Sequence, residues 1–289
     1  MRHASALLLM AALLHGAPTR AEPPAFRVEV RGKGPPVLLL PGLTCGAAVW
    51  DDLAAELCHD HECHLFTLAG FAGEPAIGAP FLPRVRDALI AYVRERKLVR
   101  PAVIGHSLGG FLALWVSATA PQRFGPVVAL DGLPFLPAAM DPAATATSMR
   151  QKAQAMRAQL ATQTQAAFQA QTREALATMM RRPEDVARVG KDAERSSPAA
   201  VAEAYFELLT TDLRPLLGRI ESPVLLVAAA AFAPDDAARR IVKDTYEAQV
   251  AAIKRHEVIV APKARHFVML DDPALTRAQV ARHLARGTR

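Results

Sequence analysis

The chain contains 289 residues, of which 51% are hydrophobic and 21% are charged. This balance is typical of a globular protein that buries a core, and the length suits one large α/β domain with an insertion or two small domains. The formal net charge is +6, but the lysines and arginines are scattered rather than gathered in a block, which indicates a solvated basic surface and argues against a nucleic-acid partner.

The first residues predict a secretory signal peptide. A basic start at Arg2 is followed by an apolar run of about a dozen residues and by small residues near Ala17 and Ala21, as in cleaved export signals. The run is shorter than the roughly 20 residues that span a bilayer, so no transmembrane segment is expected. We interpret residues 1–21 as a signal peptide and expect a periplasmic or secreted protein.

Beyond this segment, strands and helices are predicted to alternate. The run 37–40 is wholly apolar, which is typical of a strand covered on both faces of a parallel sheet. The predicted elements, in chain order, are strands over 26–30 and 37–40, a helix over 50–57, a strand over 64–68, a helix over 83–96, a strand over 102–104, a helix over 108–119 and a strand over 127–130.

No strand is predicted between residues 134 and 215. Apolar residues recur there at helical spacing behind Ser148, a candidate N-cap: Met149, Ala153, Met156 and Leu160. Methionine is frequent in this stretch and adapts to irregular apolar partners. We interpret 134–215 as an inserted helical lid over an apolar substrate, while ordinary packing between helices would explain the methionines equally well.

The alternation resumes after the insertion. Strands are predicted over 223–227 and 257–260, and helices over 235–254 and 273–284. The whole pattern predicts an α/β fold with a mostly parallel sheet that is covered on both faces. We assign residues 22–133 and 216–289 to this core and residues 134–215 to the lid.

Three cysteines follow the signal segment. An oxidising compartment permits a disulfide, and Cys58 and Cys63 are the preferred pair because a predicted turn separates them; Cys45 is then free. The stretch 58–64 also contains several histidines and acids, so a metal cluster is the alternative. It lacks a second ligand group at zinc-site spacing, and we expect neither a metal nor another cofactor.

The sequence Gly105-His106-Ser107-Leu108-Gly109 joins an apolar strand to an apolar helix. The Gly-x-Ser-x-Gly spacing suits a sharp strand-to-helix turn that exposes the serine hydroxyl above a sheet. The N-terminus of the following helix favours negative charge beside it. The motif therefore predicts Ser107 as a nucleophile.

This motif in its context resembles the α/β-hydrolase family, and the resemblance extends from Phe26 to the C-terminus. Pro41-Gly42-Leu43 follows an apolar strand, where that family carries its oxyanion-hole turn, although many members have His-Gly in place of Pro-Gly. The resemblance implies that the backbone N–H groups of Leu43 and Leu108 hold the oxyanion. Such donors are typically worth about 3–4 kcal/mol each.

A serine hydroxyl needs a base to remove its proton. The resemblance places that base at His266, which follows the last predicted strand and precedes the last helix. His106 adjoins the serine, and we interpret it as structural. His256 and His283 are interpreted as surface residues.

The usual acid position of the family, after the strand 223–227, is a run of alanines. Asp235 and Asp236 come a few residues later, at the start of a predicted helix, where acids are favoured anyway. Asp131 directly follows the strand 127–130, and some members of the family carry the acid there. Because the carboxyl ends of parallel strands share one edge of a sheet, we prefer Asp131, with Asp235 or Asp236 as the alternative.

Together these residues predict a carboxylesterase-like serine hydrolase that cleaves an ester or related acyl bond through an acyl-enzyme. The expected substrate is a small molecule with an apolar acyl or alcohol part. The missing acid keeps a non-catalytic, degenerate binding protein open, and the same fold also hosts lyase and haloperoxidase-type enzymes. The oligomeric state is not predicted.

Overall fold

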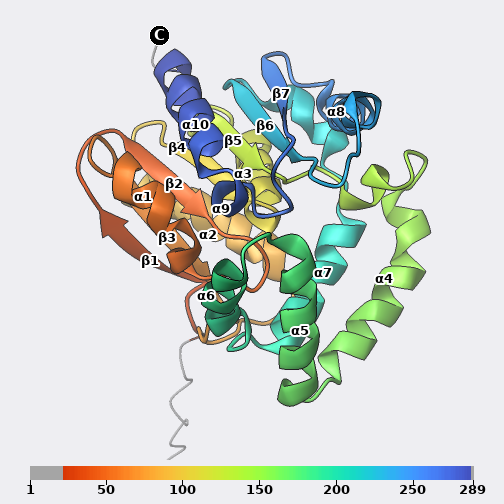
Figure 1. The fold of residues 1–289 in the computed structure, drawn as a ribbon. Coiled ribbons are helices and arrows are strands. Elements are labelled where there is room, and N and C mark those ends of the chain that lie inside the picture. Colours follow the sequence, from red (N-terminus) through yellow and green to blue (C-terminus); the bar gives the residue numbers. More distant parts are fainter. Residues whose placement is uncertain (1–21, 288–289) are drawn as a thin grey trace, which may run out of the picture.

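A seven-stranded sheet forms the centre of the protein (Figure 1). The structure, a computed structural model, describes residues 22–287, so the predicted signal peptide lies outside the described residues. One edge strand pairs antiparallel with its neighbour and the other pairings are parallel, which confirms the predicted sheet. In spatial order the strands are β1 (Phe26–Arg31), β3 (Glu62–Leu68), β2 (Pro36–Leu40), β4 (Ala102–His106), β5 (Val127–Leu130), β6 (Val224–Ala229) and β7 (His256–Ala261).

Alternate residues of the strands enter two separate cores. On β2, Leu38 and Leu40 pack in one core and Val37 and Leu39 in the other, because successive side chains of a strand leave opposite faces. The first core is covered by α2 (Phe81–Glu95), α3 (Leu108–Thr119) and α8 (Asp236–Val250). The second is covered by α1 (Asp51–Leu57), α9 (Val268–Asp271) and α10 (Pro273–Gly287).

The predicted helix starting at Pro83 begins two residues earlier, at Phe81. A proline is tolerated in the first turn of a helix, because the N–H groups of that turn have no partner within the helix. Pro83 therefore marks the first turn of α2 rather than its first residue.

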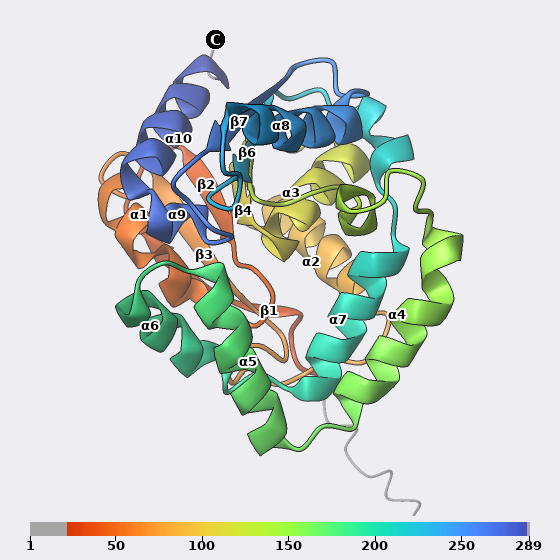
Figure 2. The ribbon, with the colours of Figure 1, turned by 45° about the vertical axis from the view of Figure 1, so that its right-hand side comes forward.

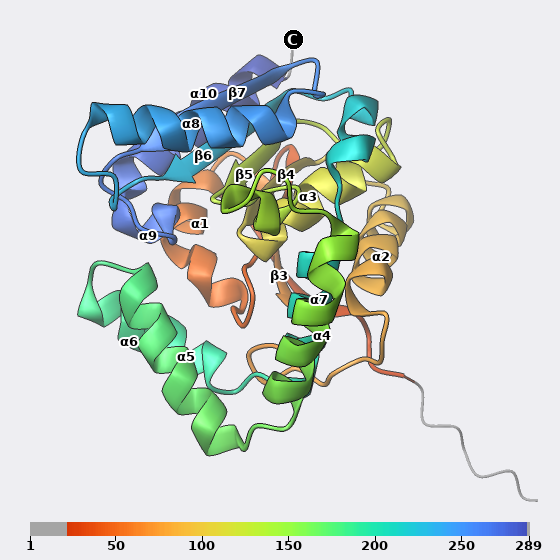
Figure 3. The ribbon, with the colours of Figure 1, turned by 90° about the vertical axis from the view of Figure 1, so that its right-hand side faces the viewer.

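Four α-helices lie between β5 and β6: α4 (Ala146–Ala161), α5 (Gln165–Met179), α6 (Pro183–Ala193) and α7 (Pro198–Thr210). We call residues 146–210 the helical insertion. Figures 2 and 3 show α4 beside α7 and α5 beside α6, all at one end of the molecule. The insertion adjoins the helices of the core, since α7 packs against α2.

The N-cap of α4 is Thr145, not Ser148. The Thr145 side chain accepts a hydrogen bond from the Ser148 N–H, and the Ser148 hydroxyl accepts one from the Thr145 N–H. Threonine and serine are both suitable N-caps, and in this reciprocal arrangement Thr145 is the N-cap while Ser148 is the third residue of the helix.

Cys58 and Cys63 form a disulfide with a Cα–Cα distance of 5.7 Å. Cys45 is free and buried, and burial raises the pKa of its thiol to about 12. Across residues 22–287, no cluster of His, Cys, Asp and Glu side chains is arranged to hold a metal ion. The same part of the chain contains no helix that is long and apolar enough to cross a membrane.

His283 is buried, with 6% of its surface exposed, so its prediction as a surface residue is wrong. It shares a face of α10 with the buried residues Val280 and Leu284, since residues three and four apart lie on the same side of a helix. Its Nε2 lies 3.2 Å from the carbonyl oxygen of Pro223. His256 is partly buried and its Nε2 lies 2.9 Å from Glu247.

Candidate active site

Ser107 lies on a sharp turn between β4 and α3. Its backbone angles, φ 53° and ψ −116°, fall where residues with a side chain are rarely found. A Cβ atom on Gly105 would lie 2.1 Å from the Gly109 carbonyl oxygen, and one on Gly109 would lie 2.0 Å from the Leu40 oxygen. Both glycines are therefore required for the close contacts that hold the serine in this conformation.

The turn after β2 passes close to Ser107. A Cβ atom on Gly42 would lie 2.8 Å from His106 Nδ1 and 3.4 Å from Ser107 Cβ. Leu43, the next residue, lines the same cavity as Ser107. Leu108 is the first residue of α3, where backbone N–H groups have no partner within the helix. Both residues expected to form an oxyanion hole thus lie beside the serine.

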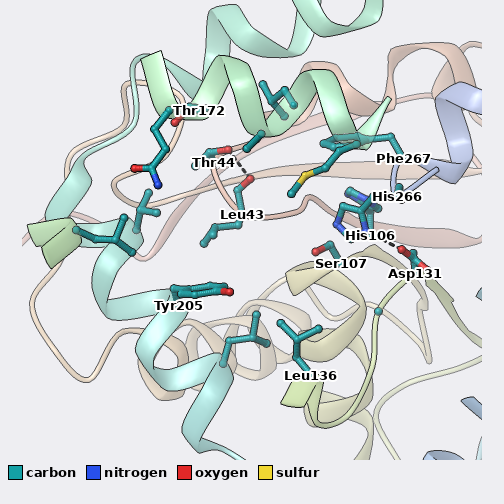
Figure 4. Close-up of a pocket in the computed structure, with 18 of the residues that line it drawn as sticks. Leu43, Thr44, His106, Ser107, Asp131, Leu136, Thr172, Tyr205, His266 and Phe267 are labelled. Carbon is teal, nitrogen blue, oxygen red and sulfur yellow. Dashed lines mark hydrogen bonds and ion pairs between the residues drawn. The ribbon is translucent and has the colours of Figure 1, made fainter. Parts of the chain in front are cut away.

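His266 follows β7, and its Nδ1 lies 2.6 Å from Asp131 Oδ2 (Figure 4). Because a carboxylate accepts hydrogen bonds, this contact places the ring proton on Nδ1. The Nε2 atom is then left with its lone pair. A histidine in this tautomer can accept a proton at Nε2, as a general base requires.

The other carboxylate oxygen of Asp131, Oδ1, accepts hydrogen bonds from the Tyr246 hydroxyl at 2.6 Å and the Ala229 N–H at 2.8 Å. Burial by itself raises the pKa of Asp131, but the hydrogen bonds from His266, Tyr246 and Ala229 outweigh it and hold that pKa below its ordinary value. Burial and the neighbouring carboxylate raise the pKa of Tyr246 well above its usual range. Asp131 is therefore ionised and Tyr246 is a protonated donor.

The alternative acids lie elsewhere. Asp235 is the N-cap of α8 and accepts a hydrogen bond from the Ala238 N–H at 2.8 Å. Asp236 pairs with Arg239 at 2.8 Å. Both aspartates are exposed, and neither lines the cavity that contains Ser107 and His266. Of the three aspartates considered from the sequence, Asp131 is the one that contacts His266.

His106 is buried next to the serine. Its Nε2 donates to the backbone carbonyl oxygen of His266 at 3.0 Å. Burial, reinforced by the neighbouring His266, lowers the pKa of His106 to about 3, so the ring is neutral. His106 therefore links the serine turn to the loop that carries His266, in line with its interpretation as a structural residue.

Ser107, His266 and Asp131 line a cavity of about 530 Å³ (Figure 4). This volume lies within the range of small-molecule sites. The rest of the wall is mostly apolar and comes largely from the helical insertion: Met156, Leu160, Phe168, Ala175, Leu176, Met179, Val201 and Leu208. The insertion therefore forms one side of the candidate active site.

Two tyrosines of the site could not be found by sequence reasoning. Tyr246 lies within α8 and bonds to Asp131, and Tyr205 lies within α7 and lines the cavity. Each is an isolated tyrosine in a helix without a motif around it. Only the packing of α8 against the sheet and of α7 against α2 and α4 identifies them.

The sheet is mostly parallel and carries a serine turn after β4, an acid after β5 and a histidine after β7. This arrangement defines the class of protein. The chain belongs to the alpha/beta hydrolase family, whose model matches residues 37–279.

Two relatives and one solved structure are informative. A pimeloyl-[acyl-carrier protein] methyl ester esterase of Stenotrophomonas maltophilia is 30% identical over 276 residues, which is 86% of this chain and 98% of that protein. A protein of the same name from Aeromonas salmonicida is 31% identical over 111 residues, and the match spans only 41% of its length. A thermophilic esterase from Thermogutta terrifontis has a similar fold, with a TM-score of 0.75 at 18% identity over 93% of this chain and 98% of that one.

Proposed function

We propose that the protein is an ester-hydrolysing enzyme with Ser107 as nucleophile, His266 as base and Asp131 as the acid that orients the base. The observation that carries the proposal is the 2.6 Å contact between His266 and Asp131 in the cavity that also contains Ser107. The esterase names of the relatives support the same chemistry.

In the proposed reaction the Ser107 hydroxyl oxygen bonds to the ester carbonyl carbon while its proton passes to His266 Nε2. The oxyanion that forms accepts hydrogen bonds from the N–H groups of Leu43 and Leu108. The imidazolium, stabilised by Asp131, returns the proton to the leaving alcohol as the carbon–oxygen ester bond breaks. Water then attacks the acyl-enzyme by the same route and releases the acid and free Ser107.

The substrate proposed is a methyl ester of a carboxylic acid. Two relatives are named as methyl ester esterases, and their names place the methyl group on the alcohol side. The cavity of about 530 Å³ is much larger than a methyl group needs, so the acyl part is the one that occupies it. This assignment agrees with the apolar wall.

A fluorophosphonate probe and a methyl ester test the proposal. The wild-type protein is expected to bind the probe covalently and to hydrolyse the ester, whereas Ser107→Ala, with folding verified by circular dichroism, is expected to do neither. The outcome that contradicts the proposal is a folded wild-type protein that is not labelled. That outcome would favour a non-catalytic binding protein, while labelling without ester turnover would favour a lyase or haloperoxidase-type reaction on the same residues.

We also propose that the protein works in an oxidising compartment, the periplasm or the extracellular space. The Cys58–Cys63 disulfide supports this, because such bonds persist mainly where thiols are not kept reduced. Cell fractionation of the full chain with an antibody against it tests the proposal, and recovery in the cytosolic fraction would contradict it.

A further inference from the structure

The cavity wall has almost no charge. Asp131 is the one Asp, Glu, Lys or Arg side chain among the described residues that line it, and its carboxylate is bonded to His266 and Tyr246. His106 also lines the cavity, but its ring is neutral because burial lowers its pKa to about 3. No cation of the wall is therefore available to pair with a carboxylate or phosphate, and a buried unpaired charge is strongly disfavoured.

A few polar side chains interrupt the apolar part of the wall: Thr44, Gln159, Gln171, Thr172 and Tyr205. Tyr205 of α7 is half-buried, and its hydroxyl has no hydrogen-bond partner anywhere in the part of the chain that the structure describes. Burial raises its pKa, so the phenol keeps its proton and is a donor. Figure 4 shows the ring with the hydroxyl directed into the cavity, on the side where Ser107 lies. A substrate that fills the cavity would displace water from this hydroxyl, and an acceptor on the substrate would then keep the donor paired.

The helix that carries Tyr205 is held in place. Glu207, two residues further along α7, is buried and accepts hydrogen bonds from the N–H groups of Phe81 at 2.8 Å and Leu82 at 2.5 Å. These N–H groups belong to the first turn of α2, which otherwise leaves them unpaired. These bonds hold α7 against α2, and the Tyr205 ring packs against the core, so the ring is placed by the fold as a specific binding contact needs.

We propose that Tyr205 determines substrate specificity by donating a hydrogen bond to an uncharged oxygen atom on the acyl chain of the ester. The enzyme then prefers an acyl chain with a ketone or ether oxygen at one position over a plain alkyl chain of equal length. It disfavours a chain that ends in a free carboxylate, because the wall lacks a cation. This inference rests on the proposed ester hydrolysis and adds the substrate class.

A positional scan tests it. Methyl esters of equal chain length, each with a ketone at a different carbon, are compared with the plain alkyl ester by kcat/KM. For the wild-type enzyme we expect one ketone position to exceed the alkyl ester by about tenfold, the value of one well-placed hydrogen bond. In Tyr205→Phe, which removes only the hydroxyl, the ratio at that position is expected to fall to about one. Both kcat/KM values in the ratio are measured on the same protein preparation, so the fraction of folded enzyme cancels.

Tyr92→Phe is the matched control. The Tyr92 hydroxyl oxygen lies 2.8 Å from His64 Nδ1, and neither residue lines the cavity. Removing this hydroxyl is expected to leave the ketone-to-alkyl ratio unchanged. A ratio that is the same in Tyr205→Phe as in the wild type, or no preferred ketone position in the wild type, would overturn the proposal.

Calorimetric binding of the same esters to Ser107→Ala separates this inference from the proposed function. If wild-type turnover is absent but Ser107→Ala binds the ketone ester more tightly than the alkyl ester, and the added change Tyr205→Phe abolishes the difference, the specificity role stands without the reaction. Equal binding of both esters in both proteins overturns the role of Tyr205 even if ester hydrolysis is found.

Discussion

Asp131 is held in place by several hydrogen bonds besides its contact with His266. Its backbone has a φ of 48°, and its N–H donates to the Val227 carbonyl oxygen at 2.8 Å. One carboxylate oxygen receives two donors and the other faces His266. Ala229, which donates one of these bonds, lies in the alanine run that occupies the position where the family resemblance first led us to expect the acid. The end of β6 thus supplies a backbone donor to an acid that directly follows β5.

Replacing Asp131 by Asn is expected to lower kcat for ester hydrolysis by about 10³–10⁴-fold, because an amide does not hold the ring proton on His266 Nδ1 as a carboxylate does. Steady-state kinetics on one methyl ester provide the measurement. Asp235→Asn and Asp236→Asn are the controls, since both aspartates are exposed on α8. Near-normal turnover in Asp131→Asn, with loss in either control, would show that another acid acts.

At the scale of elements, the loop that carries His266 is tied to the end of α5. The Arg265 guanidinium donates to the carbonyl oxygens of Ala177 at 3.2 Å and Met180 at 2.9 Å. In the opposite direction, the Arg181 N–H donates to Asp271 at 2.9 Å. A cation at the last carbonyls of a helix is favoured by the helix dipole. The helical insertion and the histidine loop are therefore expected to move together.

Arg265→Ala is expected to lower kcat by about tenfold with a smaller change in KM, because a misplaced base loses reactive geometry more than ground-state binding. Arg265→Lys keeps a cation at the carbonyls and is expected to recover part of the loss. Arg277→Ala, which removes an ion pair between Arg277 on α10 and Glu56 on α1, is the control. An unchanged kcat in Arg265→Ala would show that the Arg265 side chain does not position His266.

For the whole molecule, the insertion is joined to the core at several places. Ser196, between α6 and α7, accepts a hydrogen bond from the Ala72 N–H at 3.0 Å and donates to the Thr44 carbonyl oxygen at 3.2 Å. Glu207 joins α7 to α2, and the end of α5 contacts the histidine loop. Among the described residues, these contacts attach both helix pairs of the insertion to the turns that surround the cavity.

The core also determines how stability depends on pH. Burial lowers the pKa values of His64, His106 and His283, that of His106 to about 3. Below their ordinary pKa of about 6.5 these side chains bind protons in the unfolded chain but not in the folded one, so acid favours unfolding. Each such group lowers the free energy of unfolding by up to about 1.4 kcal/mol per pH unit between its two pKa values.

Urea unfolding between about pH 7 and about pH 5 measures this slope. We expect stability to fall as the pH is lowered, and to fall less steeply in His283→Gln, which removes one titrating group but retains a donor for the Pro223 carbonyl oxygen. His59→Gln, in the turn after α1, is the control for an exposed histidine. Identical slopes for wild type and His283→Gln would mean that His283 titrates alike in both states.

The features of this protein that depend on residues close together in the chain could be predicted from its sequence. Buried strands are continuous apolar runs, and the turn at Ser107 needs glycines at fixed distances along the chain. The mostly parallel sheet covered on both faces follows from the alternation of elements, and the resemblance to the family gave the position of His266 after the last strand. The spatial order of the strands came from the structure. Only the tertiary structure decided which acid contacts His266, that Tyr246 and Ala229 hold that acid, that Tyr205 faces the cavity and that His283 is buried. Those contacts join residues about a hundred positions apart in the chain, and their pairing depends on how helices pack on the sheet, which local patterns do not encode.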